Sequence, residues 1–188
     1  KARKSPIPVV SSYHTSFSQY SRDYYLGFLE EQVWNYLRWF HNSCLRTYCP
    51  SDMTKDEITS RGFKRVEVWS RGVDTETFNP DRRNDQIRSS LGLDNEAILG
   101  VYVGRLAKEK NLPLLLRTFP RMREAVPQLQ LMLVGDGPIR ARLEKEKPEG
   151  VHCVGYKRGV ELAEHYASGD MFLFPSVTET FGNVVLEA

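Results

Sequence analysis

The sequence predicts an α/β protein with parallel sheets, and three observations carry this prediction. Apolar runs of strand length alternate with longer segments whose apolar residues recur every three or four positions. Glycine and short polar stretches separate these runs. The alternation breaks once, at a polar stretch rich in turn residues. We therefore expect the C-terminal part of a first domain in residues 1–72, a linker in 73–96, and a second parallel-sheet domain in 97–188 that is truncated at its C-terminal end.

The first block contains strands and helices in alternation. Residues 7–13 are strand-like, and a long helix is expected over residues 24–45. The apolar positions of that helix recur at helical spacing: Leu26, Leu29, Val33, Leu37, Phe40 and Cys44. A strand at 45–48, a helix at 53–61 that ends at Gly62, and a strand at 66–69 complete the block.

The second block alternates strictly between strands and helices. Strands are predicted at 97–103, 129–134, 151–155 and 171–174, and helices at 112–125, 139–146 and 160–167. Polar or glycine-rich segments follow each strand: Gly104-Arg105, Gly135-Asp136-Gly137, Gly155-Tyr156 and Ser176 to Glu179. Because parallel sheets bind ligands beyond the carboxyl ends of their strands, these segments predict one binding edge. Gly135 to Pro138 lacks the Lys and Ser/Thr of a P-loop, which favours a tight turn.

Composition limits the classes of function. The chain has 188 residues, of which 40% are apolar and 27% charged, so it can bury a core, and its net charge of +2 gives no reason to expect nucleic acid. No apolar run reaches the ~18 residues of a membrane span, and the basic start lacks the apolar segment of a secretion signal. Cys44, Cys49 and Cys153 have no ligand-spaced histidine, which favours reduced thiols and a cytoplasmic location. The basic start without Met and a last helix of about one turn lead us to expect further sequence on both sides.

Two cations follow the first strand of the second block. A guanidinium at Arg105 and an ammonium at Lys110 are suited to clamp a diphosphate, although lone cations in loops are more often only solvated. No Asp-x-Asp motif occurs to chelate magnesium. We therefore expect neither metal nor cofactor.

Two carboxylates, Glu179 and Glu187, end the chain. Glu179 follows an apolar strand, and Gly182-Asn183 opens a segment that is typical of a helix start. Carboxylates accept hydrogen bonds from paired hydroxyls, and the N–H groups of a helix N-terminus attract anions. This arrangement suits a sugar joined to a phosphate.

Four segments in order resemble one known family. They are Gly104-Arg-Leu-Ala-Lys-Glu-Lys-Asn111, Val134-Gly-Asp-Gly-Pro138, Pro175-Ser-Val-Thr-Glu179 and the final pair of glutamates seven residues apart. They resemble the donor half of the retaining GT-B glycosyltransferases of family 4, including GDP-mannose-dependent α-mannosyltransferases and sulfoquinovosyl and other glycolipid transferases. Ser12-Tyr-His-Thr-Ser16 and Arg71-Gly-Val-Asp74 are similar to the family's acceptor domain and interdomain segments. The resemblance implies two Rossmann-like domains, both incomplete here.

The resemblance also implies roles for individual residues. Glu179 and His14 would be catalytic, with Glu179 positioning the transferred sugar rather than attacking it. The donor-binding residues would be Arg105, Lys110, Glu187, Phe181, Gly182, Asn183, Gly104 and Leu162. The implied reaction is metal-independent, retaining transfer of a hexose, with mannose as the first choice, from a GDP-sugar or UDP-sugar to a lipid or glycan. The acceptor pocket cannot be carried over.

Several alternatives stay open. The chain alone is expected to be inactive as an enzyme, so one alternative is a fragment that only binds a nucleotide sugar. A GT-B sugar-nucleotide epimerase is another, whereas a phosphorylase would need a pyridoxal lysine site that the sequence does not offer. The aromatic run from Trp34 to Phe40 fits either packing in the first domain or a peripheral contact with the inner face of a membrane.

Overall fold

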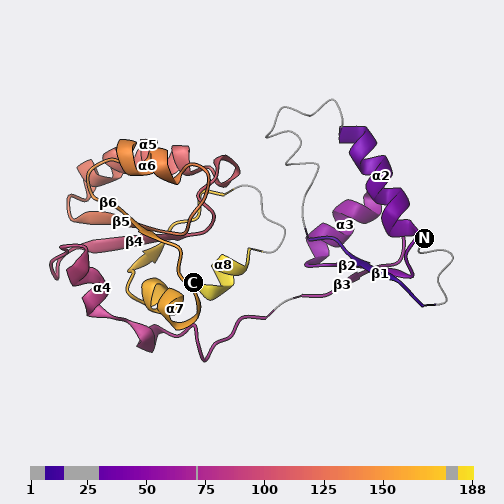
Figure 1. Cartoon of the computed structure of the whole chain (residues 1–188), viewed down its shortest axis with the longest axis horizontal. Helices are drawn as coiled ribbons and strands as arrows, with labels where there is room; N and C mark the ends of the chain where they lie inside the picture. The colour runs from indigo at the N-terminus through magenta and orange to yellow at the C-terminus, as the bar shows by residue number, and fades with distance from the viewer. Residues whose placement is uncertain (1–6, 15–29, 71, 177–181) are drawn as a thin grey trace. The chain divides into compact units, whose positions relative to one another are not determined.

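The computed structural model describes residues 7–14, 30–70, 72–176 and 182–188. The chain divides into two compact units, with the break between Gly72 and Val73 (Figure 1). Each unit contains a parallel sheet, so the predicted α/β class is confirmed. Within the described ranges, no helix is both long and apolar enough to span a membrane.

The first unit is a three-stranded parallel sheet with helices on one face. Its strands, in the order β1-β2-β3, are β1 (Val10–Ser12), β2 (Arg46–Cys49) and β3 (Val66–Val68). The helices α2 (Glu30–Asn42) and α3 (Asp52–Ser60) pack against this sheet (Figure 1). The core contains Tyr13, Trp34, Leu37, Cys49, Ile58 and Phe63. The described part of the predicted long helix ends three residues early, because the Asn42 side chain bonds the Gly62 carbonyl and the Lys64 N–H and so fixes the turn.

A buried polar cluster joins two strands of the first unit to α2. Ser11 Oγ lies 2.9 Å from His41 Nδ1 and 3.0 Å from Thr47 Oγ1. Burial lowers the pKa of His41, so its neutral ring is the form that fits this site. The cluster satisfies hydroxyl groups that an apolar core would otherwise leave without partners.

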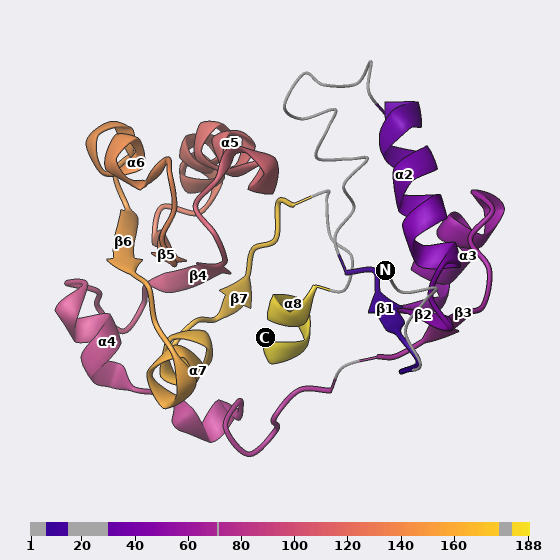
Figure 2. The same ribbon diagram turned by 45° about the vertical axis from the view of Figure 1, so that its right-hand side comes forward.

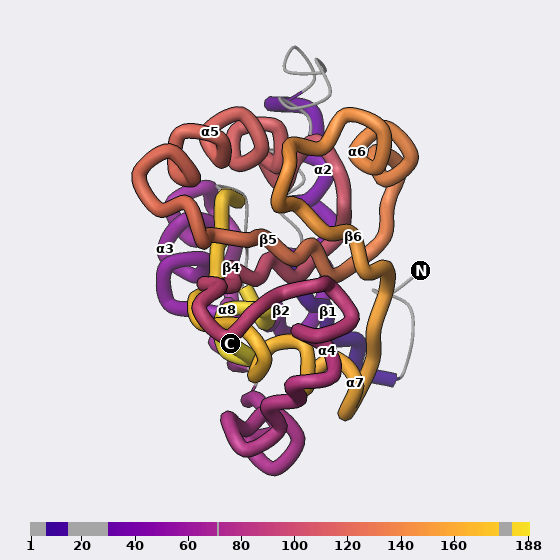
Figure 3. Tube along the Cα trace, turned by 90° about the vertical axis from the view of Figure 1, so that its left-hand side faces the viewer, coloured from indigo at the N-terminus to yellow at the C-terminus, as the bar shows by residue number. Residues whose placement is uncertain are grey.

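The second unit is a four-stranded parallel sheet covered on both faces. Its order is β6-β5-β4-β7, formed by β4 (Ile98–Val103), β5 (Leu129–Val134), β6 (Val151–Gly155) and β7 (Met171–Phe172). The helices α5 (Leu112–Ala125) and α6 (Arg140–Glu146) cover one face, and α4 (Asp85–Ser90) and α7 (Gly159–Ala167) the other, where α8 (Asn183–Glu187) also lies (Figures 2 and 3). The last strand is two residues shorter than predicted, since its pairing with β4 ends at Phe172.

Residues 73–96, the predicted linker, hold two short helices that pack on the second unit. These are η3 (Pro80–Arg82) and α4, whose Arg88 is buried. Arg88 donates to Asp170 Oδ2 at 3.0 Å, and the Leu99 N–H donates to the same oxygen at 2.8 Å. Burial alone would raise the pKa of Asp170, but these donors outweigh it and lower the pKa. The Asp170 carboxylate therefore connects α4 to β4.

Candidate functional site

A cleft of about 330 Å³ opens at the carboxyl ends of three neighbouring strands in the second unit. Gly104 and Arg105 follow β4, Asp136 follows β5, and Tyr156 follows β6. The remaining wall comes from α7 and α8. The full lining is Val103, Gly104, Arg105, Val134, Gly135, Asp136, Tyr156, Lys157, Leu162, Val184 and Glu187. Residues of three of the four strand-end segments that the sequence predicted at one edge thus line a common cavity.

Close approach of two backbones shapes the floor of this cleft. A Cβ on Gly135 would lie 2.0 Å from the Gly104 carbonyl oxygen, and Gly135 has a φ of +143°. The Gly104 N–H donates to the Val134 carbonyl at 3.0 Å, and the Gly135 N–H donates to the Gly155 carbonyl at 2.8 Å. Only glycine fits at position 135, because a Cβ would clash with the Gly104 carbonyl oxygen and because a positive φ disfavours residues that have a Cβ. Backbone hydrogen bonds at the predicted tight turn after β5 therefore connect the ends of β4, β5 and β6.

Arg105, which the resemblance assigned to the donor diphosphate, lines the cleft. Its side chain is 61% exposed, and Nη1 lies 3.5 Å from Oε1 of Glu109, whose side chain is only 1% exposed. A buried carboxylate beneath an exposed guanidinium restricts where the guanidinium can point. Lys110 ends the turn η4 (Lys108–Lys110) and is half-buried, but it does not line the described cleft.

The opposite wall carries Glu187 on α8. Its Oε2 lies 3.0 Å from the Tyr166 hydroxyl of α7, which also lies 3.2 Å from the Val184 carbonyl oxygen. Burial, and next the charge of Glu187, raise the pKa of Tyr166, so its hydroxyl stays protonated at neutral pH. Arg105 and Glu187 come from distant parts of the sequence and face one cavity with opposite charges.

An exposed aromatic ring flanks the cleft beyond β6. Tyr156 is 61% exposed, and the Arg158 guanidinium carbon lies 5.1 Å from its ring centroid. Such a pair offers a flat surface to a planar ligand. Leu162, which the resemblance also implied, lines the same side.

The other predicted site residues are not brought together by the described structure. Glu179 and Phe181 lie outside the described residues. His14 is half-buried and lies two residues after β1 in the first unit. Gly182, with a φ of +70°, precedes α8, and Asn183 begins that helix. The roles of these residues stay predictions.

Sequence reasoning placed Asp136 at this edge but missed two other contributors, Lys157 and Tyr166. Asp136 and Lys157 occupy strand-end loops, and each is paired with a nearby residue of opposite charge, Arg140 at 3.3 Å and Glu161 respectively. Tyr166 had no local signal, because its partner lies on a helix that the chain reaches only after β7. Among the described residues, no group of His, Cys, Asp and Glu side chains is arranged to hold a metal ion.

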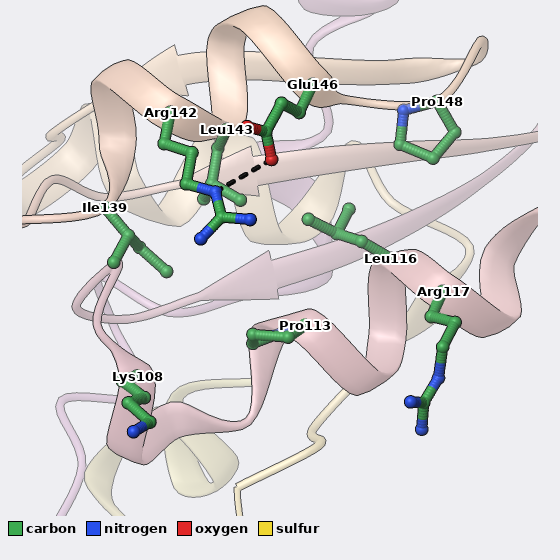
Figure 4. A pocket seen from close by; sticks show the side chains of 9 residues that line it. All are labelled: Lys108, Pro113, Leu116, Arg117, Ile139, Arg142, Leu143, Glu146 and Pro148. Carbon is green, nitrogen blue, oxygen red and sulfur yellow. Dashed lines mark hydrogen bonds and ion pairs between the residues drawn. The ribbon is translucent and has the colours of Figure 1, made fainter.

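A second cavity of about 460 Å³ lies between α5 and α6. Figure 4 shows apolar side chains of both helices facing this space, including Leu116 and Leu143. The Arg142 guanidinium at its edge is bonded to Glu146 at 2.8 Å. Since this cavity contains no residue of the predicted site, we assign the candidate site to the cleft at the strand ends.

Comparison with known proteins gives consistent matches over both units. Residues 98–188 match the family model described as glycosyl transferases group 1, and residues 1–77 match glycosyltransferase family 4. A GDP-mannose-dependent alpha-mannosyltransferase of Mycobacterium tuberculosis is 37% identical over 187 residues, covering 100% of this chain and 48% of that protein. Sulfoquinovosyl transferase SQD2 of Arabidopsis thaliana is 35% identical over 193 residues, covering 100% of this chain and 37% of that protein.

Solved structures share the fold. Anabaena Alr3699/HepE in complex with UDP-glucose matches with a TM-score of 0.77 at 18% identity, over 96% of this chain and 50% of that chain. WaaG, a glycosyltransferase involved in lipopolysaccharide biosynthesis, matches with a TM-score of 0.72 at 18% identity, over 97% of this chain and 54% of that chain. The chain therefore spans about half the length, or less, of the proteins that it resembles.

Proposed function

The chain belongs to the family 4, group 1 glycosyltransferases, and from this membership we propose that its second unit binds the nucleoside diphosphate part of a sugar donor for glycosyl transfer. One observation carries the proposal. Arg105 and Glu187, which the resemblance assigned to the diphosphate and to the ribose, line the same cleft at the carboxyl edge of a parallel sheet.

The charges of the cleft fit the two ends of such a ligand. Arg105 offers several N–H donors in a planar fork to phosphate oxygens, and Glu187 offers acceptors to the ribose hydroxyls. The absence of side chains at Gly104 and Gly135 leaves backbone surface beside the phosphate position. The volume of about 330 Å³ is at the lower end of the range of small-molecule sites.

The reaction that we propose for the whole protein is metal-independent transfer of a hexose with retention. The glycosidic bond to the donor phosphate breaks while the acceptor hydroxyl oxygen bonds to the same face of the sugar, and the acceptor proton passes to the departing phosphate oxygen. Negative charge then grows on the diphosphate, where Arg105 and Lys110 would stabilise it. Glu179 and His14 would position the sugar.

Mannose is the first choice for the transferred sugar, from a GDP-sugar, with a UDP-sugar as the second choice. Relatives named as GDP-mannose-dependent mannosyltransferases support the first, and a structural neighbour solved with UDP-glucose supports the second.

We propose that the acceptor is a lipid or a glycan. We also propose that the protein is cytoplasmic and contacts the inner face of a membrane. Support for the contact comes from α2, where Tyr36 and Trp39 are 61% and 62% exposed with ring centroids 5.8 Å apart.

Calorimetric titration of the chain with GDP and with UDP tests the proposal. We expect saturable binding of at least one nucleotide, unaffected by chelator, that Arg105→Ala weakens about tenfold to a hundredfold, since charge-assisted hydrogen bonds contribute ~1.5–3 kcal/mol. Lys110→Ala tests the second cation of the predicted clamp in the same way.

The matched control is Arg142→Ala. Arg142 is also an exposed arginine paired with a glutamate four residues later, but it lies outside the cleft. We expect this variant to bind as the parent chain does. Absence of binding by either nucleotide, or equal losses in Arg105→Ala and Arg142→Ala, would contradict the assignment.

A second candidate function is nucleotide-sugar binding without transfer. The same cleft supports it, because Arg105 and Glu187 would bind a donor whether or not an acceptor is placed beside it. Incubation of the full-length protein with labelled GDP-mannose and a lipid extract separates the two, because only a transferase moves label into the lipid. A further alternative, an epimerase, would change the sugar while it stays on the nucleotide.

A further inference from the structure

We propose that Tyr166 is a positioning residue that holds the Glu187 carboxylate in place and thereby sets the preference of the cleft for a nucleotide with ribose hydroxyls. This inference rests on the proposed function, in which Glu187 receives the ribose. It adds a residue on α7, outside the segments that resemble the family motifs, and a physical reason for its place in the site.

The contact between the phenol and the carboxylate is direct. The Tyr166 hydroxyl lies 3.0 Å from Glu187 Oε2 and 3.2 Å from the carbonyl oxygen of Val184, one turn earlier in α8. A phenol has one proton, and a charged carboxylate is a stronger acceptor than a carbonyl. Tyr166 therefore donates to Glu187, and the carboxylate retains acceptor capacity for other hydroxyls.

The contact with Tyr166 reaches the part of α8 that carries Glu187. The Val184 side chain packs against the buried cluster of β4 and β5, and the Tyr166 hydroxyl contacts both Val184 and Glu187. The Val184 side chain holds the beginning of the helix, whereas the Tyr166 hydroxyl reaches Glu187 one turn later.

The phenol ring is itself held firmly. The ring of Phe78 lies 5.8 Å from it at 77°, and the ring of Phe172 lies 5.8 Å from it at 49°. Edge-to-face and tilted contacts at this distance restrict the ring. A hydroxyl on a restricted ring presents its proton to Glu187 from a fixed direction, which a mobile side chain would not do.

The test compares a nucleotide that carries ribose hydroxyls with one that lacks them. Calorimetry measures the dissociation constants of GDP and 2′,3′-dideoxy-GDP, or of the uridine pair if UDP binds more tightly. We expect the parent chain to favour the hydroxylated nucleotide at least about tenfold, since each lost hydrogen bond to a charged group weakens binding by that order. Tyr166→Phe should weaken GDP about fivefold or more and change dideoxy-GDP less than about twofold.

Two further variants sharpen the comparison. Glu187→Asp keeps the charge but withdraws the carboxylate from Tyr166 by one methylene, so it should lose the same preference even if Tyr166→Phe does not fold. Tyr13→Phe is the control, because it removes a buried phenol hydroxyl of the first unit that has no hydrogen-bond partner among the described residues. This control should keep the full preference.

The outcomes distinguish this inference from the proposed function. If neither GDP nor UDP binds the parent chain, the proposed function fails. If a nucleotide binds with the expected preference but Tyr166→Phe and Glu187→Asp keep it, the positioning role is wrong while the function stands. Equal losses for both nucleotides in Tyr166→Phe would also overturn the role, because they would show that the residue only supports the fold.

Discussion

Replacement of Gly135 by alanine is expected to destabilise the second unit strongly. The new Cβ would lie 2.0 Å from the Gly104 carbonyl oxygen, whereas ordinary contact begins at 3.4 Å, so two backbone segments must separate by more than an ångström. Overpacking costs ~1–3 kcal/mol and a left-handed backbone ~1–2 kcal/mol for a residue with a Cβ. Adding about 1 kcal/mol for one lost hydrogen bond gives a decrease of ~3–6 kcal/mol in the free energy of unfolding.

Gly92→Ala separates the steric part from the backbone part. Gly92 also has a positive φ, +71°, but nothing lies within 4 Å of its Cβ position. We expect this variant to lose only about 1 kcal/mol. The two variants thus differ mainly in the contact with Gly104, and a unit of this size should show a difference in melting temperature of at least about 8 °C.

Urea unfolding followed by far-ultraviolet circular dichroism measures both losses. Tryptophan emission provides an internal control, because Trp34, Trp39 and Trp69 all belong to the first unit. We expect the dichroism transition to shift by more than the emission transition in Gly135→Ala. Equal stability of the Gly135→Ala and Gly92→Ala proteins would refute the argument that close backbone approach fixes this turn.

Two pH-dependent predictions follow from the shifted pKa values of Asp170 and His41. The pKa of Asp170 is lowered in the folded chain, so its stabilising contribution is complete above the unfolded pKa of about 4 and is lost as the pH falls below it. Asp170→Asn should therefore lower the melting temperature at pH 7, and the difference from the parent should shrink toward pH 3 in a pH series. The pKa of His41 is lowered by burial, so the first unit should lose stability as the pH falls below about 6.5, and a His41→Gln protein should lack this slope in tryptophan-detected melts.

Much of the fold follows from local sequence pattern. The predicted bounds of β5, β6 and α5 agree with the structure because each element is bounded by a clear change in apolar period. The GT-B class is confirmed by the solved structures of similar fold. The helix α4 escaped prediction, because six residues with one apolar side chain, Ile87, carry no period.

The site was predictable where chemistry and strand ends coincide. Gly104 and Arg105 directly follow a buried strand, and any parallel sheet brings such positions to one edge. Contacts between residues far apart in the sequence could not be predicted from local pattern, as for the pair of Tyr166 and Glu187. The anchoring role of Asp170 is of the same kind, since a Gly-Asp turn in sequence reveals nothing about Arg88 far upstream.

The segment before β4 is held in place along its length. The Asp74 carboxylate accepts the N–H groups of Glu76 and Thr77 at 3.1 and 3.2 Å, and the Phe78 N–H donates to the Asp74 carbonyl at 2.8 Å. From Phe78 onward the segment is held by aromatic and ionic contacts with the second unit. The segment from Asp74 to Arg88 therefore keeps its course through its own hydrogen bonds and through its contacts with the second unit.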